Sequence, residues 1–224
     1  MSGYYQEKLS ALRLKRCYDI APPRVRQYLN AEIRTVCDKI KPGNKVLELG
    51  CGYGRILKEL SGENAILTGI DISYANIHYA SEDYLSGYSC HLITMDALSL
   101  GFHPQTFDLV YCIQNGISAF GVNPATLMQK AIRVTRPGGR VLFSSYSEEF
   151  WEERLHWFRL QSAEDLLGEI DNDRTGNGVI VCKDGFRATT YNRKDFEKLA
   201  GKTGQKFEIY EVDDSAVFCE IIIG

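Results

Sequence analysis

The chain has 224 residues, of which 44% are hydrophobic and 25% are charged, and its formal net charge is -3 at pH 7. This size and composition suit one globular domain with a single core. The slight acidic excess disfavours a nucleic-acid partner, because phosphate backbones are usually met by an excess of Lys and Arg. No stretch reaches the roughly 18 apolar residues of a membrane span. We therefore expect a cytoplasmic protein that binds neither nucleic acid nor membrane.

Seven cysteines are scattered singly along the chain, and none forms a CxxC pair. This spacing disfavours a zinc site. Several of the cysteines lie in apolar runs, where a reduced thiol acts as a small core residue. The acidic residues between Glu169 and Asp173 are interpreted as a solvated loop. We expect no metal.

The first forty residues predict two helices. The first covers residues 4–16, and the second begins at Pro22-Pro23 and runs toward Ile40. Proline is favourable in a first helical turn because that turn needs no backbone N–H donor. Lys41-Pro42-Gly43-Asn44 then ends the helical region.

Short apolar runs and helical segments alternate from residue 45 to residue 146. Strands are expected at 45–49, 65–70, 91–94, 107–113 and 140–146. The helices between them are expected at 55–60, 74–85 and 124–135. Repeated alternation at this spacing predicts a parallel sheet with helices on both faces.

The alternation stops after Tyr146. Residues 147–170 predict a helical insertion that holds both tryptophans, and residues 179–191 predict a hairpin that turns at Lys183-Asp184-Gly185. A helix at 193–200 and an antiparallel pair of strands at 206–212 and 216–223 complete the chain.

These elements predict an α/β fold with a doubly wound, mostly parallel seven-stranded sheet that ends in an antiparallel hairpin. Within one domain we distinguish four segments: a helical cap (1–40), a cofactor-binding core (41–146), a lid or insertion (147–191) and a C-terminal helix with a hairpin (192–224).

A glycine-rich turn follows the first predicted strand, in the segment Glu48-Leu49-Gly50-Cys51-Gly52-Tyr53-Gly54. Such glycines let the backbone turn sharply and approach a ligand without an intervening side chain. The next strand ends at Asp71, about 20 residues later, which is the offset of a carboxylate that binds ribose hydroxyls. The two features together indicate a cofactor that contains adenosine.

In these segments the chain resembles the class I S-adenosylmethionine (SAM)-dependent methyltransferases. Residues 48–54 resemble the E/DxGxGxG motif of that family. Nicotinamide enzymes favour GxGxxG, whose last glycine would fall at Arg55. Met95-Asp96-Ala97, residues 107–110, residues 133–139 and the terminal hairpin resemble four further family features in the same order.

The resemblance implies a cofactor-binding role for each matching residue. The backbone amides of the loop would hold the methionine part of SAM, through Gly50, Cys51, Gly52 and Gly54. Glu48 would orient this loop or reach the amino group through water. Asp71 would accept hydrogen bonds from both ribose hydroxyls.

Residues after the second, third and fourth strands would complete the cofactor site. Ile72 and Asn76 would flank the adenine, although Asn76 could equally be a surface helix residue. Asp96 and Ala97 would bind the adenine edge. The methionine side would be lined by Ile113 and Gln114.

The acceptor side is less defined by the sequence. The exit of the fourth strand lacks the Asn/Asp-Pro-Pro-aromatic motif of enzymes that methylate nucleobase amino groups or glutamine amides. Asn115 could bind an acceptor, or could belong to an Asn-Gly turn. Tyr18 resembles a tyrosine that closes over the sulfonium in small-molecule methyltransferases, or could pack between helices. The aromatic stretch 150–158 could form a pocket wall, or could pack on the sheet as an amphipathic helix. His156 within it is a candidate base, or a partly exposed helix residue.

The leading hypothesis is methyl transfer from SAM to O, N, S or C of a small-molecule acceptor by in-line displacement. A protein or RNA methyltransferase is the alternative among enzymes. A SAM-binding module without catalysis is the alternative from another class. The sequence leaves the acceptor open, and leaves open whether the chain is a monomer or a homodimer.

Overall fold

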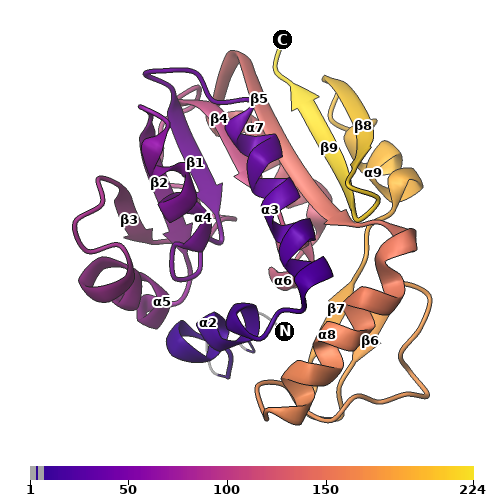
Figure 1. The fold of residues 1–224 in the computed structure, drawn as a ribbon. Helices are drawn as coiled ribbons and strands as arrows, with labels where there is room; N and C mark the ends of the chain where they lie inside the picture. Colours follow the sequence, from indigo (N-terminus) through magenta and orange to yellow (C-terminus); the bar gives the residue numbers. More distant parts are fainter. Residues whose placement is uncertain (1–3, 5–7) are drawn as a thin grey trace.

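The structure is a computed structural model that describes residue 4 and residues 8–224 (Figure 1). Part of the helix predicted at 4–16 lies outside the described residues. Within them, α2 spans Ala11–Asp19 and α3 spans Pro23–Cys37. Pro22 precedes the first turn of α3 and Pro23 begins it, as predicted. None of the helices in the described part of the chain is long and apolar enough to cross a membrane.

A seven-stranded sheet forms the centre of the molecule, in the order β3-β2-β1-β4-β5-β9-β8. Five strands run parallel, and β9 is antiparallel to both β5 and β8. Their bounds are Lys45–Leu49 (β1), Ile66–Asp71 (β2), His91–Thr94 (β3), Phe107–Cys112 (β4), Thr135–Tyr146 (β5), Lys206–Val212 (β8) and Ala216–Ile222 (β9). The predicted sheet and its terminal hairpin are confirmed.

Helices cover both faces of this sheet. α3, α4 (Arg55–Glu59) and α5 (Tyr74–Tyr79) pack on one face, and α7 (Pro124–Val134) and α9 (Arg193–Ala200) pack on the other. Side chains alternate between the two faces along each strand, so Tyr111 of β4 lies in the first core and Val110 in the second. A single-turn 3-10 helix (Leu60–Gly62) follows α4, and a π-helical turn (Ala80–Tyr84) follows α5.

The insertion after β5 lies beyond one end of the sheet (Figure 1). It contains a short 3-10 helix (Glu148–Phe150), α8 (Trp151–Ala163) and an antiparallel hairpin of β6 (Val179–Val181) and β7 (Arg187–Thr189). The predicted helix to residue 170 is too long. α8 ends at Ala163, and the backbone turns away at Asp165, whose φ is 55°.

Two further boundaries differ from the prediction. β5 begins at Thr135 instead of residue 140. The Pro-Gly-Gly turn lies within the strand as an irregularity, and the pairing of β5 with β4 shifts register there. A short helix, α6 (Gly116–Ala119), replaces the simple turn considered after Asn115.

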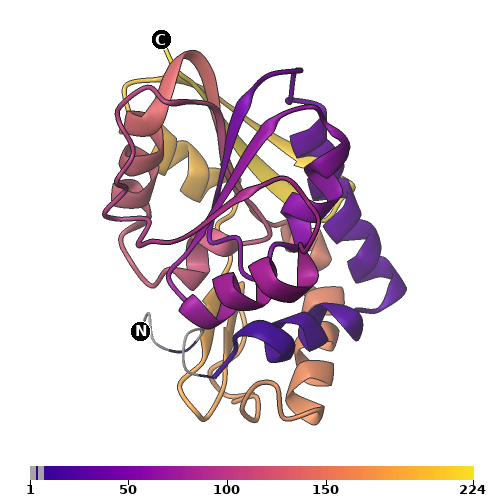
Figure 2. The same cartoon turned by 90° about the vertical axis from the view of Figure 1, so that its left-hand side faces the viewer.

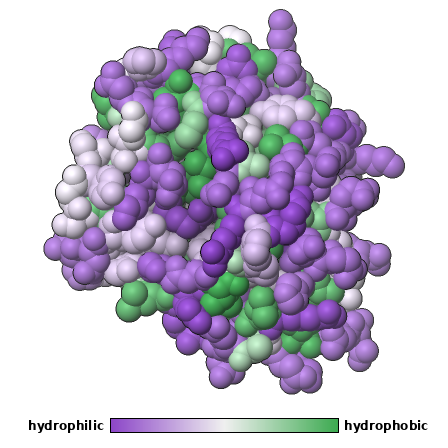
Figure 3. Space-filling model, in the orientation of Figure 1, coloured by the Kyte–Doolittle hydropathy of each residue, from purple (hydrophilic) through white to green (hydrophobic). Residues whose placement is uncertain are grey.

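The carboxyl ends of the parallel strands point toward α2 and the insertion. Figure 2 shows α2 beside α5 at this end of the sheet, and the two helices are in contact. The face seen in Figure 3 is mainly hydrophilic, and hydrophobic residues gather toward its lower part, where α2 and the insertion lie. This end of the sheet is where ligands bind in open α/β folds.

Candidate functional site

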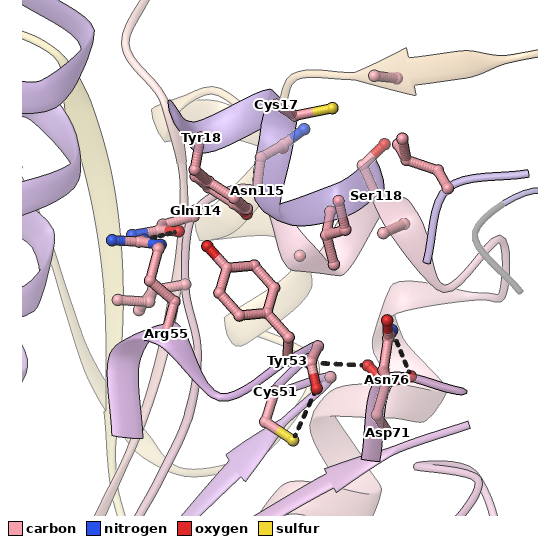
Figure 4. Close-up of a pocket in the computed structure, with 18 of the residues that line it drawn as sticks. Cys17, Tyr18, Cys51, Tyr53, Arg55, Asp71, Asn76, Gln114, Asn115 and Ser118 are labelled. Atoms are coloured by element: carbon pink, nitrogen blue, oxygen red, sulfur yellow. Dashed lines mark hydrogen bonds between the residues drawn. The ribbon is translucent and has the colours of Figure 1, made fainter. Parts of the chain in front are cut away.

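A cavity of about 180 Å³ lies at the carboxyl ends of β1, β2 and β4 (Figure 4). One side is mainly polar and includes Glu48, Gly52, Arg55, Asp71, Asn76 and Gln114. The other side is apolar and includes Leu9, Leu14, Phe120, Trp157, Phe158 and Phe186. The cavity therefore joins the motif loops to α2, α8 and the hairpin of the insertion.

The backbone N–H groups of the glycine loop already have hydrogen-bond partners within the protein. The N–H groups of Gly50 and Cys51 both donate to the carbonyl of Ile70, at 2.8 and 2.9 Å. The Gly52 N–H donates to Asp71, and the Gly54 N–H donates to the Cys51 carbonyl. Each of the four amides therefore has a partner within the protein, and their role in holding the methionine part stays a prediction.

The glycines instead let the cavity walls come close. A Cβ atom at Gly50 would lie 3.1 Å from Phe120, and one at Gly52 would lie 3.0 Å from Leu14. Gly54 does not line the cavity. A Cβ atom there would overlap the Leu85 side chain, so Gly54 serves packing between the loop and the helical turn beyond α5.

Asp71 ends β2 with its carboxylate beside the loop. It accepts hydrogen bonds from the Gly52 N–H (2.9 Å), the Ser73 N–H (2.8 Å) and the Asn76 side-chain amide (3.2 Å). Burial raises the pKa of Asp71, and these three bonds oppose the shift. Since a carboxylate has about four acceptor positions, Asp71 retains one. Binding both ribose hydroxyls, as predicted, requires one of the present donors to leave.

Asn76 is 2% exposed and is not a surface residue. Its side-chain oxygen accepts from the backbone N–H of Ala11, at 2.6 Å, while its amide donates to Asp71. Ile72 also lines the cavity and is half-exposed. Asp96 and Ala97 do not line it. Asp96 is exposed, and its carboxylate accepts from the N–H of Leu98.

Glu48 lines the polar side and is 4% exposed. The Tyr111 hydroxyl donates to its carboxylate at 3.0 Å. Burial raises the pKa of Glu48 to about 8, although the Tyr111 hydrogen bond and the nearby charge of Arg55 lower it. Ile113 and Gln114 follow β4 and line the same side, as the sequence predicted.

The three predicted catalytic residues have different positions. Tyr18 lies on α2 and lines the cavity, where its ring packs against Tyr53 and Trp157. Asn115 lines it too, and its side-chain oxygen accepts from the Ser145 hydroxyl at 2.7 Å. His156 is exposed on α8 and is not part of the cavity lining. The structure therefore gives no support to His156 as a base.

The neighbours of His156 form the wall that the sequence left open. Trp157 and Phe158 line the cavity, and the indole N–H of Trp157 donates to the Cys17 carbonyl at 2.9 Å. This bond connects α8 to α2 across the apolar side. Several lining residues were not predicted at all, among them Tyr53, Arg55, Phe120, Tyr146, Gln161 and Phe186. They come from five separate segments, so no local motif marks them.

Comparison with known proteins matches part of this chain to a family. Residues 46–139 match the model of a methyltransferase domain. A ubiquinone biosynthesis O-methyltransferase of Pseudomonas fluorescens is 28% identical over 156 residues, which cover 68% of this chain and 62% of that protein. A 2-methyl-6-phytyl-1,4-hydroquinone methyltransferase of Synechocystis is 28% identical over 151 residues, which cover 59% of this chain and 46% of that protein. The chain thus spans about half to two thirds of the length of these relatives.

Solved structures share the fold along almost the whole chain. A magnesium protoporphyrin IX methyltransferase of Synechocystis, crystallised with S-adenosylhomocysteine (SAH), matches with a TM-score of 0.66 at 17% identity, over 100% of this chain and 97% of that one. A protein of Pyrococcus horikoshii matches with a TM-score of 0.66 at 23% identity, over 92% and 94%. With its glycine loop, its Asp71 and its reversed last strand, the chain shares the fold of these solved structures, and its residues 46–139 match a methyltransferase domain.

Proposed function

We propose that this protein transfers the methyl group of SAM to a nucleophilic atom of a small-molecule acceptor. This proposal rests on a single cavity that has a polar side and an apolar side. The polar side is built largely by the segment that matches the methyltransferase domain, and the apolar side draws on α2, α8 and the hairpin outside that segment. Methyl donor and acceptor must meet within one water-poor site, and this cavity supports such a meeting.

The polar side fits the cofactor in its donor set. Asp71 retains one acceptor position for a ribose hydroxyl. Glu48 supplies a buried carboxyl group that lines the cavity and would suit the positively charged amino group of the methionine part. Bound SAM supplies a sulfonium whose methyl group a nucleophile can displace without further activation. The chain's own residues then need to orient the acceptor and exclude water.

The apolar side supports an acceptor with a flat, uncharged body. Trp157, Phe158 and Phe186 offer aromatic surface, and no charged side chain of the described residues lies among them in that half. The side-chain amides of Asn115 and Gln161 are the polar groups beside it. The relatives named above act on hydroquinone or ubiquinone precursors by their names, which favours a small ring compound over a polymer.

Proton removal from the acceptor is not assigned to a tyrosine. Burial raises the pKa of Tyr18, Tyr53 and Tyr146, so all three hydroxyls stay neutral near pH 7. They can donate or accept hydrogen bonds in the cavity, and a base is required only if the acceptor arrives protonated.

The decisive experiment measures binding of SAM and SAH by calorimetry. Wild type should bind both, and Asp71→Ala should weaken binding about ten- to more than a hundredfold, because the bond from a ribose hydroxyl to a carboxylate is charge-assisted. Glu152→Ala is the control, since Glu152 is exposed on α8 and outside the cavity lining. A wild-type protein that binds neither ligand would contradict the proposal. Methyl transfer is then tested on hydroxylated ring compounds with labelled SAM.

A further inference from the structure

Arg55 is the one cationic side chain among the described residues that line the cavity. It begins α4 directly after Gly54, and it is half-buried. Its guanidinium carbon lies 4.5 Å from the centre of the Tyr18 ring, and its Nη2 donates to the side-chain oxygen of Gln114 at 2.5 Å. Figure 4 shows this group on the opposite side of the cavity from Asp71.

The charge of Arg55 is not neutralised by a direct partner. It forms no ion pair with any carboxylate of the described residues. A guanidinium has five N–H donors in a planar fork, and the bond to Gln114 uses one of them. A cation left half-buried without an anion is costly, because it has lost part of its hydration and has gained a neutral acceptor and an aromatic ring but no opposite charge.

Gln114 adds a second unsatisfied donor at the same place. Its side-chain oxygen is held by Arg55, and its side-chain nitrogen is buried with no hydrogen-bond partner in the described part of the chain. Buried donors normally have partners, and an exception calls for an explanation. Arg55 holds the oxygen of the same amide group, so the guanidinium and the unpartnered nitrogen are neighbours at the cavity wall.

Glu48 supplies the complementary charge. It lines the same polar side, and the charge of Arg55 lowers its pKa, so the two groups are electrostatically coupled without touching. A cavity with one carboxyl group and one guanidinium, held apart, matches a zwitterion with separated charges. The amino-acid end of SAM carries an ammonium group and a carboxylate.

We propose that Arg55, with the side-chain amide of Gln114, binds the methionine carboxylate of the cofactor. This inference rests on the proposed function, and it assigns a ligand-binding role to a residue outside the glycine motif. The Tyr18 ring packs against the guanidinium and helps to hold it beside Gln114 at the cavity wall. An arginine suits this place better than a lysine, because its fork can bind both oxygens of a carboxylate at once.

The test compares two ligands that differ only in the carboxylate. SAH and its decarboxylated analogue are titrated by calorimetry into wild type, Arg55→Met and Lys58→Met. Lys58 lies one turn further along α4, packs on Tyr84 and Tyr88, and is not part of the cavity lining, so it is the matched control. Arg55→Met should weaken SAH binding about 10- to 100-fold and should change binding of the analogue less than about twofold. Lys58→Met should change neither.

Arg55→Lys keeps the proposal testable if Arg55→Met does not fold. It retains the charge but loses the fork, so SAH should bind more weakly than to wild type and the analogue should bind equally well. An equal loss for both ligands would show a general change in the cavity and would overturn the proposal. An unchanged SAH affinity with a raised acceptor KM would assign Arg55 to the acceptor and would also overturn it. Failure of wild type to bind SAH would instead remove the proposed function itself, and this inference with it.

Discussion

The side chain of Asn76 links Asp71 to the start of α2. Its amide donates to the Asp71 carboxylate at 3.2 Å, and its oxygen accepts from the backbone N–H of Ala11 at 2.6 Å. Asp71 can take up a second ribose hydroxyl only if a donor such as Asn76 leaves. On the proposed function, ribose binding would therefore be coupled to the contact that holds α2 over the cavity.

Asn76→Ala should loosen the start of α2. The substitution removes both hydrogen bonds and leaves the Ala11 N–H without its partner, which should lower the free energy of unfolding by about 1–2 kcal/mol. Amide hydrogen exchange should become faster at Ala11. Asn172→Ala, in an exposed loop, is the control and should change neither quantity. Unchanged exchange at Ala11 would contradict this account of the link.

Gly54→Ala should destabilise the fold more than Gly43→Ala. The two glycines have nearly the same φ, 83° and 81°, so the backbone strain of an alanine is similar at both. A Cβ atom at Gly54 would overlap Leu85, whereas no atom lies within 4 Å of one at Gly43. We expect Gly43→Ala to cost about 1 kcal/mol and Gly54→Ala about 1–3 kcal/mol more, measured by urea unfolding. Equal costs would show that Leu85 moves aside freely.

Binding of SAH at pH 7 should release protons from Glu48. Burial raises the pKa of this carboxyl group to about 8, so it is mainly protonated before binding. An ammonium group beside it favours the charged form and lowers the pKa, so up to about one proton leaves. Calorimetry in phosphate and in Tris buffer measures this number, and the affinity should rise from pH 6 to pH 8. Glu48→Gln should abolish the release, and an unchanged release would assign the proton to another group.

Glu32→Gln should remove a loss of stability that wild type shows between about pH 4.5 and pH 8. Glu32 lies on α3, is fully buried, and its carboxylate oxygens have no hydrogen-bond partner in the described structure. Burial raises its pKa to about 8, which the nearby hydroxyls of Ser144 and Tyr28 only partly offset.

The direction follows from proton binding. Between its ordinary pKa of about 4.5 and the folded value of about 8, the folded state holds a proton that the unfolded state has lost. Stability should therefore fall as the pH rises through this window, by up to about 1.4 kcal/mol per pH unit. Urea unfolding of wild type and Glu32→Gln from pH 5 to pH 9 checks this. Parallel curves for the two proteins would contradict it.

The features that depend on residues close together in the chain could be predicted from the sequence. The strands, the loop with Gly50 and Gly52, and Asp71 at the end of β2 follow from short apolar runs and turn chemistry, and they lie where expected. The hydrogen-bond partners of the loop amides could not be predicted in this way. Whether the Cys51 N–H is free depends on the position of the Ile70 carbonyl, which only strand pairing fixes.

The apolar wall could not be predicted because α8 has a mixed face. Its buried residues include Arg154 and Gln161 as well as Leu155, Trp157 and Phe158. Because polar residues are among the buried ones, the hydrophobic periodicity of this helix is weak. A clearer periodicity would have predicted that His156 lies on the exposed face. Arg55 was missed for another reason: it stood out in the sequence only as a departure from the nicotinamide motif, and its role depends on Gln114 and Tyr18, which are far away in the chain.

The bond from Trp157 to the Cys17 carbonyl has a consequence for how such proteins diverge. Both residues lie outside residues 46–139, so on the proposed function this part of the acceptor wall could change during evolution while the segment that matches the methyltransferase domain stays the same. Since this bond connects α2 to α8, a substitution that shifts α2 should also change the position of α8. Shifts in acceptor preference among descendants of this chain should therefore come as paired substitutions in the two helices.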